Sequence, residues 1–417
     1  MKFLKIFFNR PFLGVNMTQF FDTLCNNFLR NAITAAVIFG VIAVKNNTVI
    51  SALMISILMI PSFLFMATAG EIVDKYPKDF IIKLLKILQF LTATLACIGF
   101  SDKNIWILLI ALFCMGTFAA FLSTAKYSIL PDILPQNHLL AANSIIQMMV
   151  FFAILGGTVF GGIIFSFKIY ILYTFLLITS VLGVIFAFFI PRQNNYFPDT
   201  TIHINPIIAI IKNITFMLEY KSIFYSINAI SWFWFVGTIM ISAIPTFSKE
   251  VINGDNTIFT LLIILFTIGL SVGTLSCQSI LKGKITYKHI LPCLSVIVLS
   301  LIDLTYASSL YTTDNKIATL RYFITEWQGL HIILGILIFS IAGGIYIVPL
   351  TTMLQIMAPT NARAKIIASN NIINALFMIL GSCLCALFLW LKIKTTSIFF
   401  ILAILNSIII IYFALKK

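Results

Sequence analysis

The sequence predicts an all-α membrane protein with twelve transmembrane helices in two bundles of six. Its composition is the first observation behind this prediction: of 417 residues, 60% are hydrophobic and only 10% are charged, and the mean hydropathy is +1.07. Such values lie outside the range of soluble proteins. The second observation is that about twelve apolar stretches, each near the length that spans a bilayer, follow one another along the chain.

The positions of these stretches predict the domain organisation. The first six predicted helices cover residues 12–44, 48–73, 80–100, 105–125, 139–167 and 169–190. The second six cover residues 223–247, 257–281, 287–310, 329–354, 366–391 and 396–414. Asn, Pro and charged residues interrupt the apolar pattern between the two sets. We therefore expect an N-terminal six-helix bundle over 1–191, a cytoplasmic linker over 192–222 and a C-terminal six-helix bundle over 223–417.

The distribution of positive charge predicts the orientation in the membrane. Most of the 27 Lys and Arg residues lie near the chain ends, in the linker and in every second loop. Lys86 is assigned to the loop between the second and third predicted helices. Loops rich in Lys and Arg stay in the cytoplasm, so both termini are expected there. The formal charge of +14 then reflects topology and attraction to anionic membrane lipid, and it does not indicate binding to nucleic acid.

The first predicted helix carries a polar face. Gln19, Asp22, Asn26 and Arg30 recur at helical spacing and so lie on one side of it. A charged side chain in the middle of a bilayer costs about 2.5–3.5 kcal/mol, so this face is expected to line a wet cavity. Asp22 and Arg30 are separated by about 12 Å along the helix, with Asn26 between them. The face is either a site for substrate or a coupling ion, or a charge latch between helices that never touches substrate.

A short charged hinge between the second and third predicted helices indicates a gate. Gly70 permits close approach of two helices, Asp74 can accept hydrogen bonds from a helix N-terminus, and Lys75 favours the cytoplasmic side. Near the start of the eleventh predicted helix lie Arg363 and Asn370, and Asn370 is expected to cap this helix or to contact Asp74. These five residues are the predicted gating residues.

Several longer strings resemble one branch of a known family. They are residues 18–32, 125–131, 231–235, 343–350 and 362–377, together with the hinge 70–79. These strings resemble major facilitator superfamily proteins of the lysophospholipid transporter branch, and the membrane domain of bifunctional acyltransferase/acyl-carrier-protein synthetases. The resemblance implies the major facilitator fold and a secondary transporter that works by alternating access. The expected substrate is lysophospholipid such as lysophosphatidylethanolamine, carried towards the cytoplasmic leaflet of a bacterial inner membrane.

The chemistry of such a substrate, with its anionic phosphate and often an ammonium group, suggests roles for individual residues. Arg30 is expected to hold the phosphate, Asp22 to meet an ammonium group or cycle protons, and Asn26 to bridge them. Lys126, at the end of the fourth predicted helix, either guides the headgroup or extends towards water at the membrane surface. A proton or sodium ion is the expected coupling ion, although residues 223–247 lack the charges that relatives are thought to use. A cytoplasmic acyltransferase is an expected partner, whereas no enzymatic activity, cofactor, metal or oligomer is expected.

Other functions remain open. The aromatic residues Trp232, Phe233, Trp234 and Phe235 either line an acyl path or pack in the core, and packing is favoured. A transporter of a small polar solute or a drug exporter would share the fold. A non-transporting membrane platform for an acyltransferase is a further alternative. A channel is disfavoured, because the chain shows no filter-like loop or ring of like charge.

Overall fold

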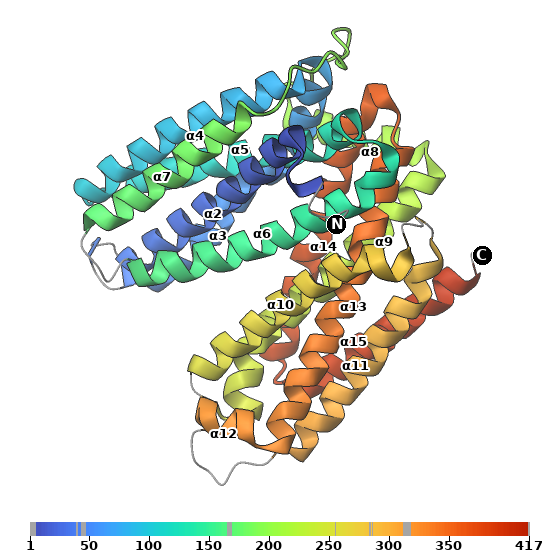
Figure 1. Ribbon diagram of the computed structural model, residues 1–417. Coiled ribbons are helices and arrows are strands. Elements are labelled where there is room, and N and C mark those ends of the chain that lie inside the picture. Colours follow the sequence, from blue (N-terminus) through green and yellow to red (C-terminus); the bar gives the residue numbers. More distant parts are fainter. Residues whose placement is uncertain are drawn as a thin grey trace. The chain divides into compact units, whose positions relative to one another are not determined.

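The computed structural model describes residues 6–38, 41–42, 47–164, 169–254, 256–282, 285, 287–311 and 318–415. These residues are almost entirely helical and form no strand, so the all-α prediction is confirmed (Figure 1). Within them, eleven helices are long and apolar enough to cross a membrane. The first long helix is not among the eleven because its polar side chains lower its hydropathy, although its 29 residues would span about 43 Å.

Twelve long helices form two sets of six along the described chain. The first set is α2 (Arg10–Ile38), α3 (Asn47–Lys75), α4 (Lys78–Ser101), α5 (Ile105–Ile133), α6 (Gln136–Ile164) and α7 (Ile169–Ala187). The second set is α9 (Lys221–Thr246), α10 (Asn256–Leu281), α11 (Ile290–Leu310), α13 (Trp327–Met357), α14 (Arg363–Trp390) and α15 (Thr395–Leu415). Two short helices, α8 (Pro206–Leu218) and α12 (Leu320–Thr325), were not predicted.

Three predicted boundaries need correction. Helix α5 continues to Ile133, with Pro131 in its last turn, so Lys126 lies inside the helix rather than at its end. Helix α14 begins at Arg363, which places Asn370 two turns inside it. The predicted first helix ran to residue 44, whereas α2 ends at Ile38, and residues 39–40 and 43–46 lie outside the described residues.

The linker contains a helix because its sequence supplies the usual start signal. The side chain of Asn205 accepts hydrogen bonds from the amides of Ile207 and Ile208, and Pro206 occupies the first helical position. One side of α8 is buried through Ala209, Asn213 and Met217, and Asn213 Nδ2 donates to the carbonyl oxygen of Ala67 in α3 (3.1 Å). Thus 192–222, expected to be a plain linker, includes an element packed onto the helices.

Contacts divide the chain into two compact units. The first comprises 1–224 with 354–372, and the second comprises 225–353 with 373–417. The end of α13 and the start of α14 therefore belong to the first unit, which the sequence alone did not indicate. The division of the chain at the linker stays a prediction.

Close backbone contact joins α2 to α6 in the first unit (Figure 1). A Cβ atom added to Gly157 would lie 2.6 Å from the carbonyl oxygen of Leu24, and one added to Gly161 would lie 2.7 Å from that of Phe28. Only glycine fits at these two positions. Small residues at helix crossings are the usual way for helices to pack tightly where lipid removes the hydrophobic driving force.

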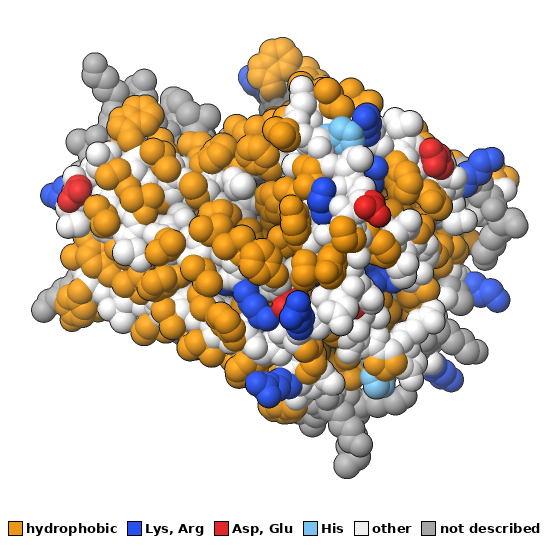
Figure 2. All heavy atoms as spheres, turned by 90° about the horizontal axis from the view of Figure 1, so that it is seen from above, with side chains coloured by type: hydrophobic (Ala, Val, Ile, Leu, Met, Phe, Trp, Pro, Cys, Tyr) orange, Lys and Arg blue, Asp and Glu red, His pale blue; other side chains and the backbone are white. Residues whose placement is uncertain are grey.

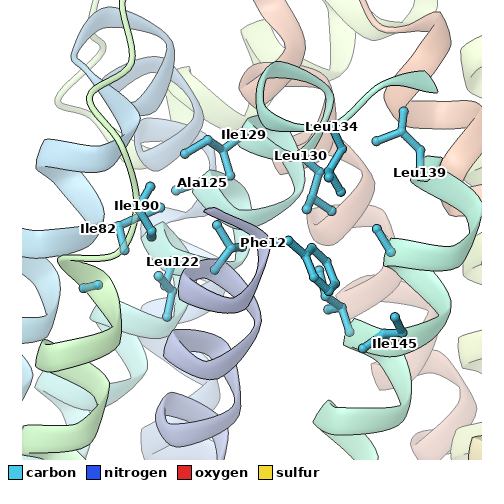
Figure 3. Packing of buried hydrophobic residues seen from close by; sticks show 14 of the residues in the cluster. Phe12, Ile82, Leu122, Ala125, Ile129, Leu130, Leu134, Leu139, Ile145 and Ile190 are labelled. Atoms are coloured by element: carbon cyan, nitrogen blue, oxygen red, sulfur yellow. The ribbon is translucent and has the colours of Figure 1, made fainter. Parts of the chain in front are cut away.

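An apolar cluster holds the beginning of α2 against α5 and α6. Phe12 points towards the side chains of Leu130 and Ile145, and Leu122 and Ala125 lie on the neighbouring α5 (Figure 3). All of these side chains are buried. The cluster therefore places the first turns of α2 at the same level as residues 122–130 of α5.

The outer surface is mostly apolar. Large hydrophobic side chains such as Trp106, Leu91 and Ile408 are more than half exposed. Figure 2 shows one face on which hydrophobic side chains cover much of the surface and charged side chains form only small groups. Exposed apolar surface of this extent is unfavourable in water and favourable in lipid. The surface thus agrees with a protein that spans a membrane through many helices.

Candidate functional site

The polar face of α2 meets two polar residues of α4. Asp22 Oδ1 lies 2.9 Å from Lys86 Nζ, and both side chains are almost fully buried, at 3% and 1% exposed. Lys86 Nζ also donates to Gln89 Oε1 at 2.6 Å. A buried ion pair is tolerated when further hydrogen bonds satisfy its partners. Lys86 therefore lies inside α4 and belongs to this buried polar network, and it is not one of the loop charges.

Asn26 closes this polar network. Its Nδ2 donates to Asp22 Oδ2 (3.2 Å), and its Oδ1 accepts from Gln89 Nε2 (3.2 Å). Asp22, Asn26, Lys86 and Gln89 thus form a ring of hydrogen bonds between two helices. The sequence contained a signal for the two α4 residues, because Lys86 and Gln89 interrupt an apolar run and are three positions apart on one helix face.

Two further cations near this network have no carboxylate partner among the residues that the structure describes. Arg30 is half-buried on α2, and Lys126 of α5 is 5% exposed. Among the described residues, neither forms an ion pair within 4 Å. Lys126 Nζ lies 4.3 Å from the ring centroid of Tyr127, an arrangement that favours a cation. With Lys86 matched to Asp22, the region keeps a net positive charge.

Gln19 extends the polar face towards the start of α2. Its Nε2 donates to Thr23 Oγ1 at 2.8 Å. Its Oε1 is buried and finds no hydrogen-bond partner in the described part of the chain. The structure therefore brings Gln19, Asp22, Asn26 and Arg30 onto one face, but only Asp22 and Asn26 among them contact each other directly.

Of the predicted gating residues, Gly70, Asp74 and Arg363 lie at the start of α14. Asp74, at the end of α3, accepts hydrogen bonds from the amides of Ala364 and Lys365, each at 3.0 Å. A carboxylate at a helix N-terminus satisfies free amides and complements the helix dipole. Asp74 is thus the cap of α14, whereas Asn370 lies further along that helix and donates to Asn371 Oδ1 at 3.3 Å.

Gly70 allows α3 to approach α14 closely. A Cβ atom at this position would lie 2.8 Å from the Cβ of Ala368 and 3.0 Å from the Cα of Lys365. The contact is therefore possible only without a side chain. Lys75, which follows Asp74, is partly exposed and makes no ion pair with any described residue.

A second carboxylate ties the same helix ends together. Asp132, at the end of α5, pairs with Lys78 Nζ (2.5 Å) and Arg363 Nη1 (2.9 Å). Asn143 of α6 and Gln355 of α13 exchange two amide hydrogen bonds, at 2.7 and 3.1 Å. The partners of Asp132 and the Asn143–Gln355 pair are buried, and the Asp132 side chain is 5% exposed, so these groups can separate only if their polar atoms find other partners. Asp132 was not among the predicted gating residues.

The linker is attached beside this contact. Glu71 accepts from the amide of His203 (2.7 Å) and lies 2.8 Å from His203 Nδ1. Lys212 Nζ lies 2.8 Å from His203 Nε2. Because the lysine ammonium can only donate, Nε2 accepts and Nδ1 carries the proton that faces Glu71.

In the second unit, the aromatic residues of α9 surround a small cavity. Trp232 and Phe233 line it together with Phe266, Phe339 and Tyr346, and the lining is almost wholly apolar. Trp232 Nε1 donates to Asn406 Oδ1 at 3.0 Å. Phe233 stacks on Tyr346 with ring centroids 6.4 Å apart. These contacts hold Trp232 and Phe233 within the packing of the second unit.

Comparisons with known proteins show which family has this architecture. The family model of the Major Facilitator Superfamily matches residues 19–382. The lysophospholipid transporter LplT of Photorhabdus laumondii is 25% identical over 349 residues, which cover 83% of this chain and 80% of that protein. The protein of the same name from Enterobacter sp. is 25% identical over 297 residues, covering 70% of this chain and 68% of that protein.

Solved structures show the same fold. The E. coli fucose:proton symporter FucP superposes with a TM-score of 0.71 at 12% identity, over 98% of each chain. The human organic anion transporter MFSD10 superposes with a TM-score of 0.70 at 12% identity, over 96% of this chain and 98% of that one. At such identities the likeness concerns the fold alone.

The helices, the surface and the family match agree. Two sets of six long helices, an apolar exterior and a buried polar network are what a multi-pass transporter requires, and the family model covers most of the chain. The protein is accordingly a transporter and not an enzyme. It belongs to the Major Facilitator Superfamily.

Proposed function

We propose that this protein is a secondary transporter that carries lysophospholipid, such as lysophosphatidylethanolamine, to the cytoplasmic leaflet of a bacterial inner membrane. The single observation that supports this most is the pair of cations, Arg30 and Lys126, without a carboxylate partner among the described residues. The names of the relatives in Photorhabdus and Enterobacter point to the same substrate class.

The charges suit a lysophospholipid headgroup. Its phosphate is an anion, and Arg30 can bind it through two parallel hydrogen bonds, which a guanidinium forms more readily than an ammonium does. Lys126 supplies a second positive charge in a desolvated place, where a charge pair is worth more than in water. Without such an anion, a buried cation carries an uncompensated desolvation cost.

The proposed role of Asp22 involves Lys86 as well as the substrate or coupling ion. Because Lys86 already neutralises it, Asp22 is held in place and keeps Asn26 and Gln89 oriented. An ethanolamine ammonium or a coupling proton would have to compete with Lys86 for this carboxylate. We propose that such competition couples binding at the site to a change in the contact between α2 and α4.

The contacts at the start of α14 form the proposed gate. Asp74, Asp132 and the Asn143–Gln355 pair together hold the first turns of α14 and the end of α13 against α3, α5 and α6. Alternating access requires these contacts to form in one state and break in the other. Gly70, Lys75, Arg363 and Asn370 lie at or beside this contact and belong to the proposed gate region.

Uptake of labelled lysophosphatidylethanolamine by spheroplasts tests the proposal. Transported lipid becomes protected from extraction by albumin added outside, which also reports the direction of movement. We expect uptake by the wild type, and at least a tenfold loss in Arg30→Gln and Lys126→Gln because each removes one phosphate-binding charge.

Lys249→Gln is the matched control, since Lys249 is exposed on the protein surface. It should leave uptake unchanged. If folded wild-type protein moves no lysophospholipid, the proposal fails, and a small polar solute or a drug becomes the substrate to test. If it binds an acyltransferase without moving lipid, it is a membrane platform instead.

A further inference from the structure

The linker helix α8, labelled in Figure 1, is apolar on two sides. One side is buried through Ala209 and Met217. On the other side, Ile207, Ile211 and Leu218 are each more than half exposed. At about 100° per residue, these three residues fall within an arc of about 40°, and they define the exposed apolar side of α8. A helix with apolar side chains on both sides is typical of a protein interior or a membrane and is unfavourable in water.

Helix α8 is too short to cross a bilayer. Its 13 residues span about 20 Å, whereas the hydrocarbon core of a bilayer is about 30 Å thick. Apolar segments of about 10–14 residues are usually core helices or interfacial helices. The exposure of Ile207 and Ile211 means that the described part of the chain does not enclose α8. Its length and its exposed side together indicate an interfacial helix.

The contact between α8 and α3 gives the depth of α8 in the membrane. Asn213 of α8 donates to the carbonyl oxygen of Ala67, which lies about 12 Å along α3 from its end at Lys75. The 29 residues of α3 span about 43 Å, enough to cross the hydrocarbon core and both headgroup layers. Each headgroup layer is about 5–8 Å thick. Ala67 and the α8 residues beside it therefore lie at the edge of the hydrocarbon core.

The charged and aromatic residues of this segment suit lipid headgroups. Lys212 is the only charged residue of α8 and is exposed. Its long side chain can keep its apolar stem in lipid and extend its ammonium group to the headgroups. Phe216 and Tyr220 lie side by side with ring centroids 5.3 Å apart, and the exposed Lys221 follows. Basic and aromatic residues on an apolar helix are typical of interfacial helices, and anionic lipid attracts the lysines.

We propose that α8 lies in the membrane interface at the Asp74 end of α3, with its exposed apolar side among the lipid acyl chains and Lys212 among the headgroups. The lipid surface is thus the partner of this side, whichever solute the protein carries. The carbonyl oxygen of Asn213 also accepts a hydrogen bond from Ser369 Oγ at 3.2 Å, so α8 contacts both α3 and the beginning of α14. Lipid bound to α8 therefore anchors the linker beside the proposed gate.

Collisions of a spin label with oxygen and with a polar nickel complex test the proposal, because oxygen concentrates in lipid whereas the nickel complex stays in water. The label is attached to Ile211→Cys, and separately to Ile207→Cys, in nanodiscs of phosphatidylethanolamine and phosphatidylglycerol that hold one protein molecule each. Asn194→Cys is the matched control, since Asn194 is exposed in the part of the linker without a helix. Both labelled isoleucine positions should show more oxygen collisions than the control and about tenfold fewer nickel collisions.

All variants carry Cys383→Ser, because Cys383 is an exposed native cysteine, and the signal of this background is subtracted. Each variant should keep the Tm of the background, since the replaced side chain is exposed. Frequent nickel collisions at Ile207 and Ile211 would mean that this side faces water and is open to a partner protein, which would overturn the proposal. Few collisions with either reagent would mean that protein covers it, with the same consequence. Neither result bears on the lysophospholipid assignment, because no transport is measured.

Discussion

At the scale of single residues, the buried pair of Asp22 and Lys86 is the feature with the largest energetic consequence. Both charged side chains are buried away from water. Their mutual attraction, together with hydrogen bonds to Asn26 and Gln89, offsets the cost of desolvation. Such a pair contributes little net stability compared with an apolar pair, but removal of one partner leaves the other charge buried and alone.

We expect Asp22→Asn and Lys86→Gln each to lower the free energy of unfolding by about 3–5 kcal/mol. The double variant should lose clearly less than the sum of the two, because it leaves no lone charge. Thermal unfolding in detergent measures all three. Additive effects would mean that the two side chains do not interact, and Lys83→Gln on the exposed side of α4 is the control, since Lys83 is partly exposed in its pair with Asp79.

At the scale of elements, the approach of α3 to α14 depends on one missing side chain. Gly70 lets the backbone of α3 come near Ala368, and this brings Asp74 within hydrogen-bonding distance of the first amides of α14. The cap and the glycine therefore act together. A substitution at either position should weaken the same contact.

We expect Gly70→Ala to push α14 away from α3, since its Cβ would lie 2.8 Å from that of Ala368. A cysteine introduced at Ser369, which is fully buried, should then react faster with a maleimide, by about fivefold or more. That factor corresponds to about 1 kcal/mol, the usual loss when a cap is removed. Asp74→Ala should act in the same direction.

Ala368→Gly combined with Gly70→Ala provides the matched test. It removes the nearest clashing atom, so the reactivity should return part of the way to that of the parent protein. Unchanged reactivity in Gly70→Ala alone would show that the helices do not need this close contact.

At the scale of the whole molecule, the distribution of Lys and Arg predicts the orientation of the protein in the membrane. Most Lys and Arg residues lie at the chain ends, in the linker and in alternate loops, and such loops remain cytoplasmic. Because the number of membrane helices is even, we expect both chain ends on the same side.

We expect a fluorescent protein fused after Lys417 to fluoresce and alkaline phosphatase fused there to be inactive, because both report a cytoplasmic C-terminus. Fusions within the loop between α4 and α5, at Lys103, should give the opposite pair of results. Active phosphatase at the C-terminus would contradict the predicted orientation.

The helices and their order could be predicted from the sequence because each apolar stretch forms a helix for a reason that lies within the stretch itself. In lipid a spanning segment must satisfy its own backbone hydrogen bonds, so length and hydropathy identify it. Helix α8 could also have been predicted from Asn205, Pro206 and the apolar run that follows. The polar face of α2 was visible for the same reason, since helical spacing depends only on neighbours in the chain.

The partners of these residues were decided by the tertiary structure. Sequence spacing cannot tell that Lys86 reaches Asp22, that Asp132 joins Lys78 to Arg363, or that Asp74 rather than Asn370 caps α14. Each of these contacts joins residues far apart along the chain. The physical reason is that a charge in an apolar surrounding takes the partner that helix packing brings near, and packing depends on small residues such as Gly70 and Gly157 acting across different helices.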